Sequence, residues 1–328
     1  MVSPRTLRGG AFVIVLLLAA SLSVACGGDS ADRPRPRVAL GVAAQNRAEI
    51  QQREEETGHR MAGIRAFRRW DEPIFDSGMR WARSGGRELY LSIKSKRLNN
   101  AVIPWRDIAN AEPGDPLYAD MLSQSRQLKD FGASVYLIFN HEPEARPSRA
   151  MGTPADFVAA WRKLVKVHRK AGVRNVRYVW TVTAIAFSRN GGREAREFYP
   201  GDAYVDGIGV DAYNWYRCLS PTNPWMSLAE LIEPHRLFGA AHPGKELMVL
   251  EWASAEDPQS PGRKAAWLRD AAELLQRPPY AAYTALIYWD GRHVPEASHI
   301  RCDLDYRSSA SALSAWRQIT DSAPYRFH

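Results

Sequence analysis

The sequence predicts a single (β/α)8 barrel, and three observations support this fold class. After the first 37 residues, short apolar runs alternate with helical patterns to the end of the 328-residue chain. Most of these runs are continuously apolar, which is typical of parallel strands that are buried on both faces. No internal repeat and no shift in composition marks a second domain, so the whole alternation belongs to one fold.

Apolar runs and helix boundaries place the individual elements. The best-defined helix begins after Thr153, with Pro154 at its first position and Asp156 placed as in a capping box. Its apolar residues fall on one face, and it ends at Gly172. A second clear helix is predicted over residues 262–278. The predicted strands are Val38–Val42, Ala62–Phe67, Leu89–Ile93, Val135–Phe139, Val176–Trp180, Gly207–Val210, Leu247–Leu250 and Ala285–Tyr288.

An open doubly wound sheet is the alternative fold, and one stretch could support it. Gly207-Ile208-Gly209-Val210-Asp211-Ala212 loosely matches a dinucleotide-binding fingerprint. The glycines, however, lie within the predicted sixth strand instead of on a turn that opens a helix. We therefore expect no dinucleotide and no other cofactor. We expect no metal either, because the histidines and cysteines do not show ligand spacing.

Residues 1–25 have the features of a secretory signal peptide. Arg5 and Arg8 precede an apolar run from Ala11 to Ala20, and small residues follow it. The run is half of the roughly 20 residues that a membrane-spanning helix needs. We therefore expect an extracytoplasmic protein.

Cys26 follows the small residues in a context that resembles the lipobox of bacterial lipoproteins. This resemblance implies that Cys26 is lipidated and anchors a bacterial lipoprotein to the cell membrane. Secretion after ordinary cleavage nearby is the alternative. Residues 26–37 are rich in Gly, Asp, Arg and Pro and are predicted to form a flexible tether, followed by the barrel domain over residues 38–328.

The net charge of +8 indicates no particular partner. The basic residues are scattered, acids lie between them, and no block of five or more like charges occurs. We expect no nucleic-acid partner, and we expect a monomer whose membrane contact is made only through the lipid.

Two glutamates directly follow apolar runs at the ends of predicted strands. Glu142 follows Val135–Phe139 closely, and Glu251 comes directly after Leu247–Leu250. The active sites of (β/α)8 barrels lie at the carboxyl ends of the strands, so both acids are expected at one rim. Paired carboxylates held in different environments are the machinery of glycoside hydrolysis.

Aromatic residues at the same strand ends could provide flat surfaces for sugar rings. Five of the 11 tryptophans fall there: Trp70, Trp180, Trp215, Trp252 and Trp289. Packing in the core is the alternative for any single one, but their common location favours a sugar-binding cleft.

Other hydrolytic chemistries are not supported by the motifs. His141-Glu142 does not continue as a zinc-protease helix, because Pro143 follows and residue 145 is alanine. No Gly-x-Ser-x-Gly elbow and no phosphate-binding glycine-rich loop occurs.

Three stretches resemble glycoside hydrolase family 26, a retaining family of (β/α)8 barrels whose best-known activity is endo-β-1,4-mannanase. They are Phe139-Asn140-His141-Glu142-Pro143-Glu144, the run from Tyr199 to Trp215, and Leu250-Glu251-Trp252. The resemblance covers about residues 38–325.

The resemblance implies roles for individual residues. Glu142 would be the general acid/base and Glu251 the nucleophile. His141, Tyr213 and Trp289 match substrate-binding positions of the family. We add Trp180, Trp252 and Asn214 as substrate-binding residues because they stand at the ends of predicted strands.

The implied reaction is endo-acting cleavage of a β-linked polysaccharide, foremost β-1,4-mannan, by double displacement. The stretch Glu144-Ala145-Arg146-Pro147 lacks the tryptophan that the family's mannanases often carry after the acid/base. β-Glucan and β-1,3-xylan therefore remain alternative substrates. A non-catalytic carbohydrate-binding lipoprotein on the same barrel is the alternative function.

Cys218 and Cys302 are the two cysteines that remain after Cys26. Outside the cytoplasm such a pair favours a disulfide over a metal site. Cys218 follows the sixth predicted strand and Cys302 follows the eighth, so both loops are expected on the face of the cleft. We predict that a Cys218–Cys302 disulfide braces the cleft.

Overall fold

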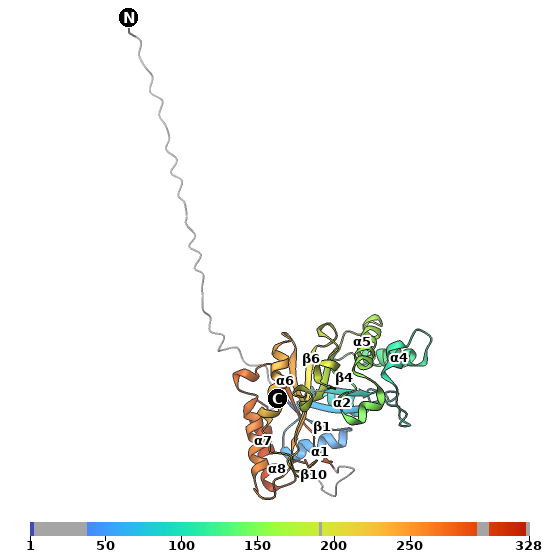
Figure 1. Ribbon diagram of the computed structural model, residues 1–328. Helices are drawn as coiled ribbons and strands as arrows, with labels where there is room; N and C mark the ends of the chain where they lie inside the picture. Colours follow the sequence, from blue (N-terminus) through green and yellow to red (C-terminus); the bar gives the residue numbers. More distant parts are fainter. Residues whose placement is uncertain (3–37, 190–191, 294–301, 326–328) are drawn as a thin grey trace. The chain divides into compact units, whose positions relative to one another are not determined.

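A computed structural model describes the chain except for residues 3–37, 190–191, 294–301 and 326–328 (Figure 1). Most of the predicted signal peptide, the predicted lipidation site Cys26 and the tether lie outside the described residues. Within the described part of the chain, no helix has both the length and the apolar character that crossing a membrane would require.

Eight parallel strands form a closed barrel in the order of the sequence, and β8 closes it by pairing with β1. The predicted (β/α)8 fold is confirmed, and each predicted strand is present. The strands are β1 (Ala39–Ala43), β2 (Gly63–Arg69), β3 (Glu88–Lys94), β4 (Val135–Phe139), β5 (Val176–Thr183), β6 (Gly207–Asn214), β7 (Glu246–Ser254) and β8 (Tyr283–Tyr288).

Helices follow the strands and cover the outside of the barrel, with α7 and α8 packed side by side (Figure 1). The helix predicted after Thr153 has its capping box, formed with Asp156. The α-helices are α1 (Arg47–Thr57), α2 (Ser77–Ser84), α3 (Trp105–Asn110), α4 (Pro116–Phe131), α5 (Pro154–Lys170), α6 (Leu228–Ala240), α7 (Arg263–Leu274) and α8 (Ala310–Asp321). Short 3-10 helices are η1 (Arg146–Met151), η2 (Ala184–Phe187), η3 (Ala195–Phe198), η4 (Asp202–Tyr204) and η5 (Pro278–Tyr280), and a small antiparallel pair joins β9 (Arg292–His293) to β10 (Cys302–Asp303).

The interior of the barrel is a small apolar cluster, separate from the large core between barrel and helices. Its buried members are Ala39, Tyr90, Ile138, Val179, Met248, Leu250, Ala285 and Ile287. Glycine is required where β1 meets β2, because a Cβ on Gly41 would overlap the carbonyl oxygen of Gly63. The interior is therefore filled, and the chemistry lies above it at the carboxyl ends of the strands.

Alternation along each strand decides which side chains reach this upper layer. In β6, Gly209 meets Thr181 inside the barrel, while Ile208 and Val210 belong to the outer core. Continuing the same alternation brings Asp211 and Tyr213 inward.

An irregularity in β7 changes this alternation at one critical place. Val249 pairs with Val210 of β6, but Asp211 pairs with Glu251, so Leu250 is an extra residue in β7. Leu250 packs inside the barrel, whereas Trp252 belongs to the outer core. The bulge therefore directs Glu251 into the mouth of the barrel beside Asp211, although strict alternation would have directed Trp252 there.

Candidate active site

Glu251 is held by hydrogen bonds on both of its carboxylate oxygens. The Arg65 guanidinium of β2 donates to Oε1, with Nε at 3.1 Å and Nη2 at 3.0 Å. The Tyr213 hydroxyl donates to Oε2 at 2.5 Å. These contacts fix the orientation of a carboxylate whose residue is 6% exposed. A carboxylate that is held in one orientation is well suited to attack a substrate from a defined direction.

Arg65 also faces a second buried acid. Its Nη2 lies 3.7 Å from Oδ2 of Asp211, and both side chains are fully buried. Burial by itself would lower the pKa of Arg65, but the charges of Asp211 and Glu251 outweigh it and raise this pKa. Burial, together with the Glu251 charge, raises the pKa of Asp211 well above its ordinary value despite the opposing charge of Arg65. The guanidinium is therefore a shared counter-ion for the two acids.

Glu142 is placed by an unusual backbone conformation after β4. Asn140 and Glu142 have positive φ angles of 45° and 51°, which are uncommon for residues other than glycine. The N–H of Glu142 donates to the carbonyl oxygen of Thr181 in β5 at 3.1 Å. Oδ1 of the buried Asn140 accepts hydrogen bonds from the backbone and hydroxyl of Ser95. Strain of this kind persists only where the surroundings enforce it, and it is common at functional sites.

The segment after Glu142 is anchored to neighbouring loops. The carboxylate of Glu144 accepts hydrogen bonds from the N–H and hydroxyl of Thr183 at 2.8 Å and 2.6 Å. The Arg193 guanidinium donates to the carbonyl oxygens of Pro143 and Glu144. Glu144 is therefore a structural acid, and Glu142 is the one that reaches the mouth.

Three carboxyl groups converge at the mouth of the barrel. Glu142, Asp211 and Glu251 each present an oxygen that lies within 4.8 Å of those of the other two. Glu142 is partly accessible to solvent, whereas the other two are buried. These oxygens could coordinate a cation. The Arg65 guanidinium, however, already supplies positive charge to the carboxylates of Asp211 and Glu251.

The environment favours the protonated form of Glu142. Burial and the nearby charges of Glu251 and Glu144 raise the pKa of Glu142 to about 8, although Arg65 and Lys94 oppose the shift. A carboxyl that keeps its proton near neutral pH can donate it to a leaving group. Glu142 thus lies near other acids, whereas Glu251 is held by the Arg65 guanidinium and the Tyr213 hydroxyl.

His141 and Trp289 complete the predicted site. The His141 ring lies 5.2 Å from that of Phe67, and burial together with the charges of Arg65 and Lys94 lowers its pKa well below the ordinary value. His141 is therefore neutral at ordinary pH. Trp289 is half-buried, and its ring stands edge-on to Tyr213 with 6.0 Å between centroids. Both residues lie near the carboxylate cluster, and their role in substrate binding stays a prediction.

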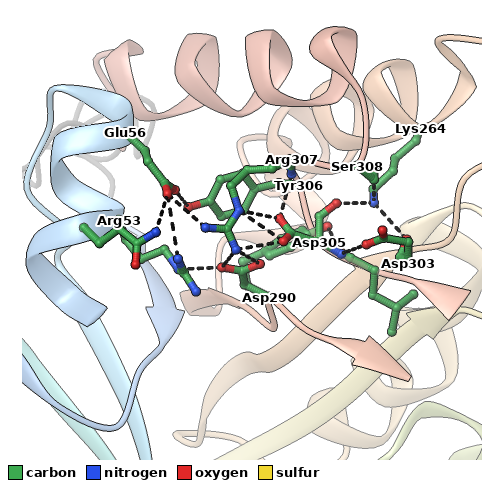
Figure 2. A network of polar contacts seen from close by, with 12 residues as sticks. Arg53, Glu56, Lys264, Asp290, Asp303, Asp305, Tyr306, Arg307 and Ser308 are labelled. Carbon is green, nitrogen blue, oxygen red and sulfur yellow. Dashed lines mark hydrogen bonds and ion pairs between the residues drawn. The ribbon is translucent and has the colours of Figure 1, made fainter. Parts of the chain in front are cut away.

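A network of ion pairs surrounds Asp290, the residue that follows Trp289 in the chain (Figure 2). The next residue, Asp290, has a fully buried side chain that contacts Arg53 of α1 at 2.5 Å and Arg307 at 3.2 Å. Burial raises the pKa of Asp290 to about 7, against the opposing charges of the two arginines. Buried Lys264 of α7 donates to the carbonyl oxygens of Asp303 and Asp305, which ties the following loop to the same helix layer.

Two tryptophans predicted to bind substrate lie elsewhere, so the prediction is wrong for them. Trp180 and Trp252 are fully buried in the outer core. Trp180 packs against rings near α6, with Tyr199 at 5.0 Å, and Trp252 packs against Trp267 of α7 at 5.4 Å. Both point away from the barrel axis, so neither can stack on a sugar in the mouth.

The prediction for Asn214 is also wrong. Asn214 is 1% exposed, its amide donates to the hydroxyl of Ser254, and its carbonyl accepts from the N–H of Met226. Its polar atoms thus join β6 to β7 and to the loop before α6. Trp70 is buried as well, whereas Trp215 is half-buried and packs on Tyr213 at 4.8 Å. Of the five tryptophans at strand ends, Trp215 and Trp289 keep exposed surface.

Arg65 and Asp211 were not predicted as site residues, although a feature of the sequence could have identified each of them. Arg65 stands in the middle of an apolar strand, where a charged side chain needs a partner. Asp211 precedes Tyr213 by two positions, so both share a face of the strand.

Cys218 and Cys302 form a disulfide, with 5.4 Å between their Cα atoms. It joins the loop after β6 to β10, beyond β8. The bond therefore connects segments that follow Tyr213 and Trp289 in the chain.

A (β/α)8 barrel with paired carboxylates at its mouth is an arrangement that glycoside hydrolases use. The family model of glycosyl hydrolase family 26 matches residues 124–245, which include Glu142 and Tyr213. Endoglucanase H of Acetivibrio thermocellus is 28% identical over 229 residues, which are 66% of this chain and 23% of that protein. The chain thus spans about a quarter of this curated relative's length.

Solved structures of family 26 enzymes share the fold. A β-mannanase from Bacteroides ovatus superposes with a TM-score of 0.61 at 15% identity, covering 89% of this chain and 91% of that chain. An endo-β-1,4-mannanase from Cellulomonas fimi also gives a TM-score of 0.61 at 16% identity, covering 89% and 72%. The resemblance noted in the sequence is therefore confirmed: the chain is similar to glycoside hydrolase family 26 over residues 124–245.

Proposed function

We propose that the protein is a retaining glycosidase in which Glu251 is the nucleophile and Glu142 the general acid/base. The observation that carries this proposal is the approach of the two carboxylates to within 4.8 Å at the barrel mouth. Retaining enzymes keep their carboxyl groups about 5–5.5 Å apart, whereas inverting enzymes need about 6.5–9.5 Å to admit a water. The short separation supports direct attack on the sugar.

In the first step, Glu251 attacks the anomeric carbon while Glu142 protonates the leaving glycosidic oxygen. Arg65 and Tyr213 hold the attacking carboxylate in one orientation, so little reorganisation is needed on attack. Glu142, now ionised, then removes a proton from water, which hydrolyses the glycosyl-enzyme and restores both acids.

We propose a β-1,4-linked polysaccharide as the substrate, foremost mannan. The solved family 26 structures of similar fold include β-mannanases, while the curated relative is an endoglucanase, which favours β-glucan as the second candidate. A panel of β-1,4-mannan, mixed-linkage β-glucan and β-1,3-xylan, with products separated by size, would identify the backbone. The size distribution would also separate endo from exo action.

Substitution of the two glutamates tests the mechanism. Glu251→Ala should lower release of reducing sugar by about 1,000-fold or more, because the covalent step is lost. Glu246 is the matched control, since it lies on the same strand but at the opposite end of the barrel. Glu246→Gln should keep most of the activity. Full activity in Glu251→Ala would contradict the assignment of the nucleophile.

A further inference from the structure

A cavity opens at the carboxyl ends of β2 and β3, beside Glu142. It has a volume of about 280 Å³ and is lined by Phe67, Arg68, Arg69, Glu72, Ser92, Lys94 and His141. This volume is close to the lower limit for ligand pockets in proteins. The cavity shares His141 with the proposed catalytic site.

Positive charge dominates the lining. Arg68 forms ion pairs with the carboxylates of Asp76 and Glu72, at 3.0 Å and 3.9 Å. Glu72 is further occupied by a hydrogen bond from the N–H of Arg69. Among the described residues, the guanidinium of Arg69 and the ammonium of Lys94 have no ion-pair partner within 4.0 Å. Two cationic groups of the cavity thus remain available to a ligand.

The side chain of Lys94 points into the barrel mouth, where partial burial of its charge is unfavourable. It follows Ser92 by two residues in β3, so both side chains point into the barrel mouth. Burial lowers the pKa of Lys94, and the charge of Arg69 lowers it further, although Glu142 opposes the shift. A half-buried cation beside another cation is unfavourable unless an anion joins them.

Two buried polar atoms on the same walls also lack a partner. In the described part of the chain, neither Oγ of Ser92 nor Nδ1 of His141 makes a hydrogen bond. Buried polar groups are nearly always hydrogen-bonded in folded proteins. Cationic and hydrogen-bonding groups on one cavity wall form an arrangement that suits a sugar bearing an anionic group.

We propose that this cavity is a subsite for a sugar residue that carries an oxyanion, such as a carboxylate or a sulfate ester. Arg69 and Lys94 would bind the anionic group, so the enzyme would prefer a form of its β-1,4-linked polysaccharide in which some sugar residues carry such a group. The subsite rests on the proposed function, because it assigns the substrate class of the same active site. Glu142 does not repel such a group while it keeps its proton.

Binding measurements test the subsite separately from hydrolysis. Oligosaccharides from β-1,4-mannan and β-glucan would be used in three forms, namely neutral, oxidised to the 6-carboxylate and sulfated. Calorimetric titration of the Glu251→Gln variant should give about tenfold tighter binding of at least one anionic form than of its neutral parent. The difference should shrink as NaCl rises from about 0.05 to 0.5 M. A preference for the carboxylate or the sulfate identifies which oxyanion is recognised.

Charge variants identify the residues responsible. Arg69→Gln in the same background should remove most of the preference, because it should lower the affinity for the anionic form far more than the affinity for the neutral form. Arg126→Gln is the matched control, because Arg126 is exposed on α4 and its loss changes the net charge equally. Equal loss of preference in both variants, or equal binding of neutral and anionic forms, would overturn the subsite.

Hydrolysis separates the two proposals. Failure of the wild-type protein to cleave any form would refute the proposed function, whereas an anion preference in the binding assay would still support the subsite. Cleavage of neutral and anionic forms at the same rate, with the same affinity, would refute the subsite alone.

Discussion

At the scale of single residues, the raised pKa of Glu142 has a direct consequence for the pH dependence of activity. Glu142 is proposed to act first as an acid, so its protonated form is the active one. Activity should therefore fall as the pH rises through the pKa of about 8. Because the charge of Lys94 lowers this pKa, Lys94→Met should move the alkaline limb of kcat/KM to higher pH.

The limb is measured by following hydrolysis of a neutral substrate across pH 5–10. Arg126→Gln again controls for the change in net charge. An alkaline limb that stays in place in Lys94→Met, or moves to lower pH, would contradict the role of Glu142 as the titrating acid.

Arg65 should be the residue whose loss most strongly affects stability at the site. Arg65→Met leaves Asp211 and Glu251 buried without their counter-ion. Removing one partner of a buried ion pair typically costs about 3–5 kcal/mol, so the free energy of unfolding should fall by that order. Urea denaturation measures the change, and exposed Arg126→Met should alter it by less than about 0.5 kcal/mol. Unchanged stability in Arg65→Met would mean that the two acids do not need the guanidinium.

At the scale of elements, most of the strands could be predicted because each is buried on both faces. Such a strand is a continuous apolar run, and parallel strands in a barrel meet this condition along nearly their whole length. The residues at which the strands end could not be predicted as well. β6 and β7 continue past Val210 and Leu250, so Asp211 and Glu251 lie within strands and not after them.

These longer strands explain the errors at the tryptophans. A residue near a strand end points either into the mouth or toward the helices, and the sequence position alone does not decide between them. In β5 the alternation that places Val179 inside directs Trp180 outward. In β7 the bulge reverses the alternation. The side chain of Glu251 therefore points into the barrel mouth, and that of Trp252 points into the outer core. Register shifts depend on pairing between strands, which a single sequence does not reveal.

The disulfide makes a testable contribution at this scale. Cys218 and Cys302 are separated by 84 positions, and closing a loop of this length stabilises a fold by up to about 4–5 kcal/mol in the chain-entropy model. Reduction should lower the free energy of unfolding by about 2–4 kcal/mol, the range typical of native disulfides. A Cys218→Ser, Cys302→Ser double variant is the control, since added reductant should not change its stability further. Intact-mass analysis showing two free thiols in the unreduced protein would contradict the bond.

At the scale of the whole molecule, we expect the barrel to fold without the N-terminal segment. The barrel elements begin at Ala39, directly after the predicted tether. A protein that lacks residues 1–37 should therefore retain the fold and the activity of the full chain.

We propose that Cys26 anchors the protein to the outer face of a bacterial membrane through a lipid. Expressed in a bacterial host, the full-length protein should sediment with membranes and be released by detergent. Cys26→Ser should appear in the soluble extracytoplasmic fraction, because the lipid has no other attachment point in the proposal. Cys218→Ser is the matched control and should stay with the membranes. Sedimentation of Cys26→Ser with membranes to the same extent as the unmodified chain would refute the lipid anchor without affecting the proposed chemistry of the barrel.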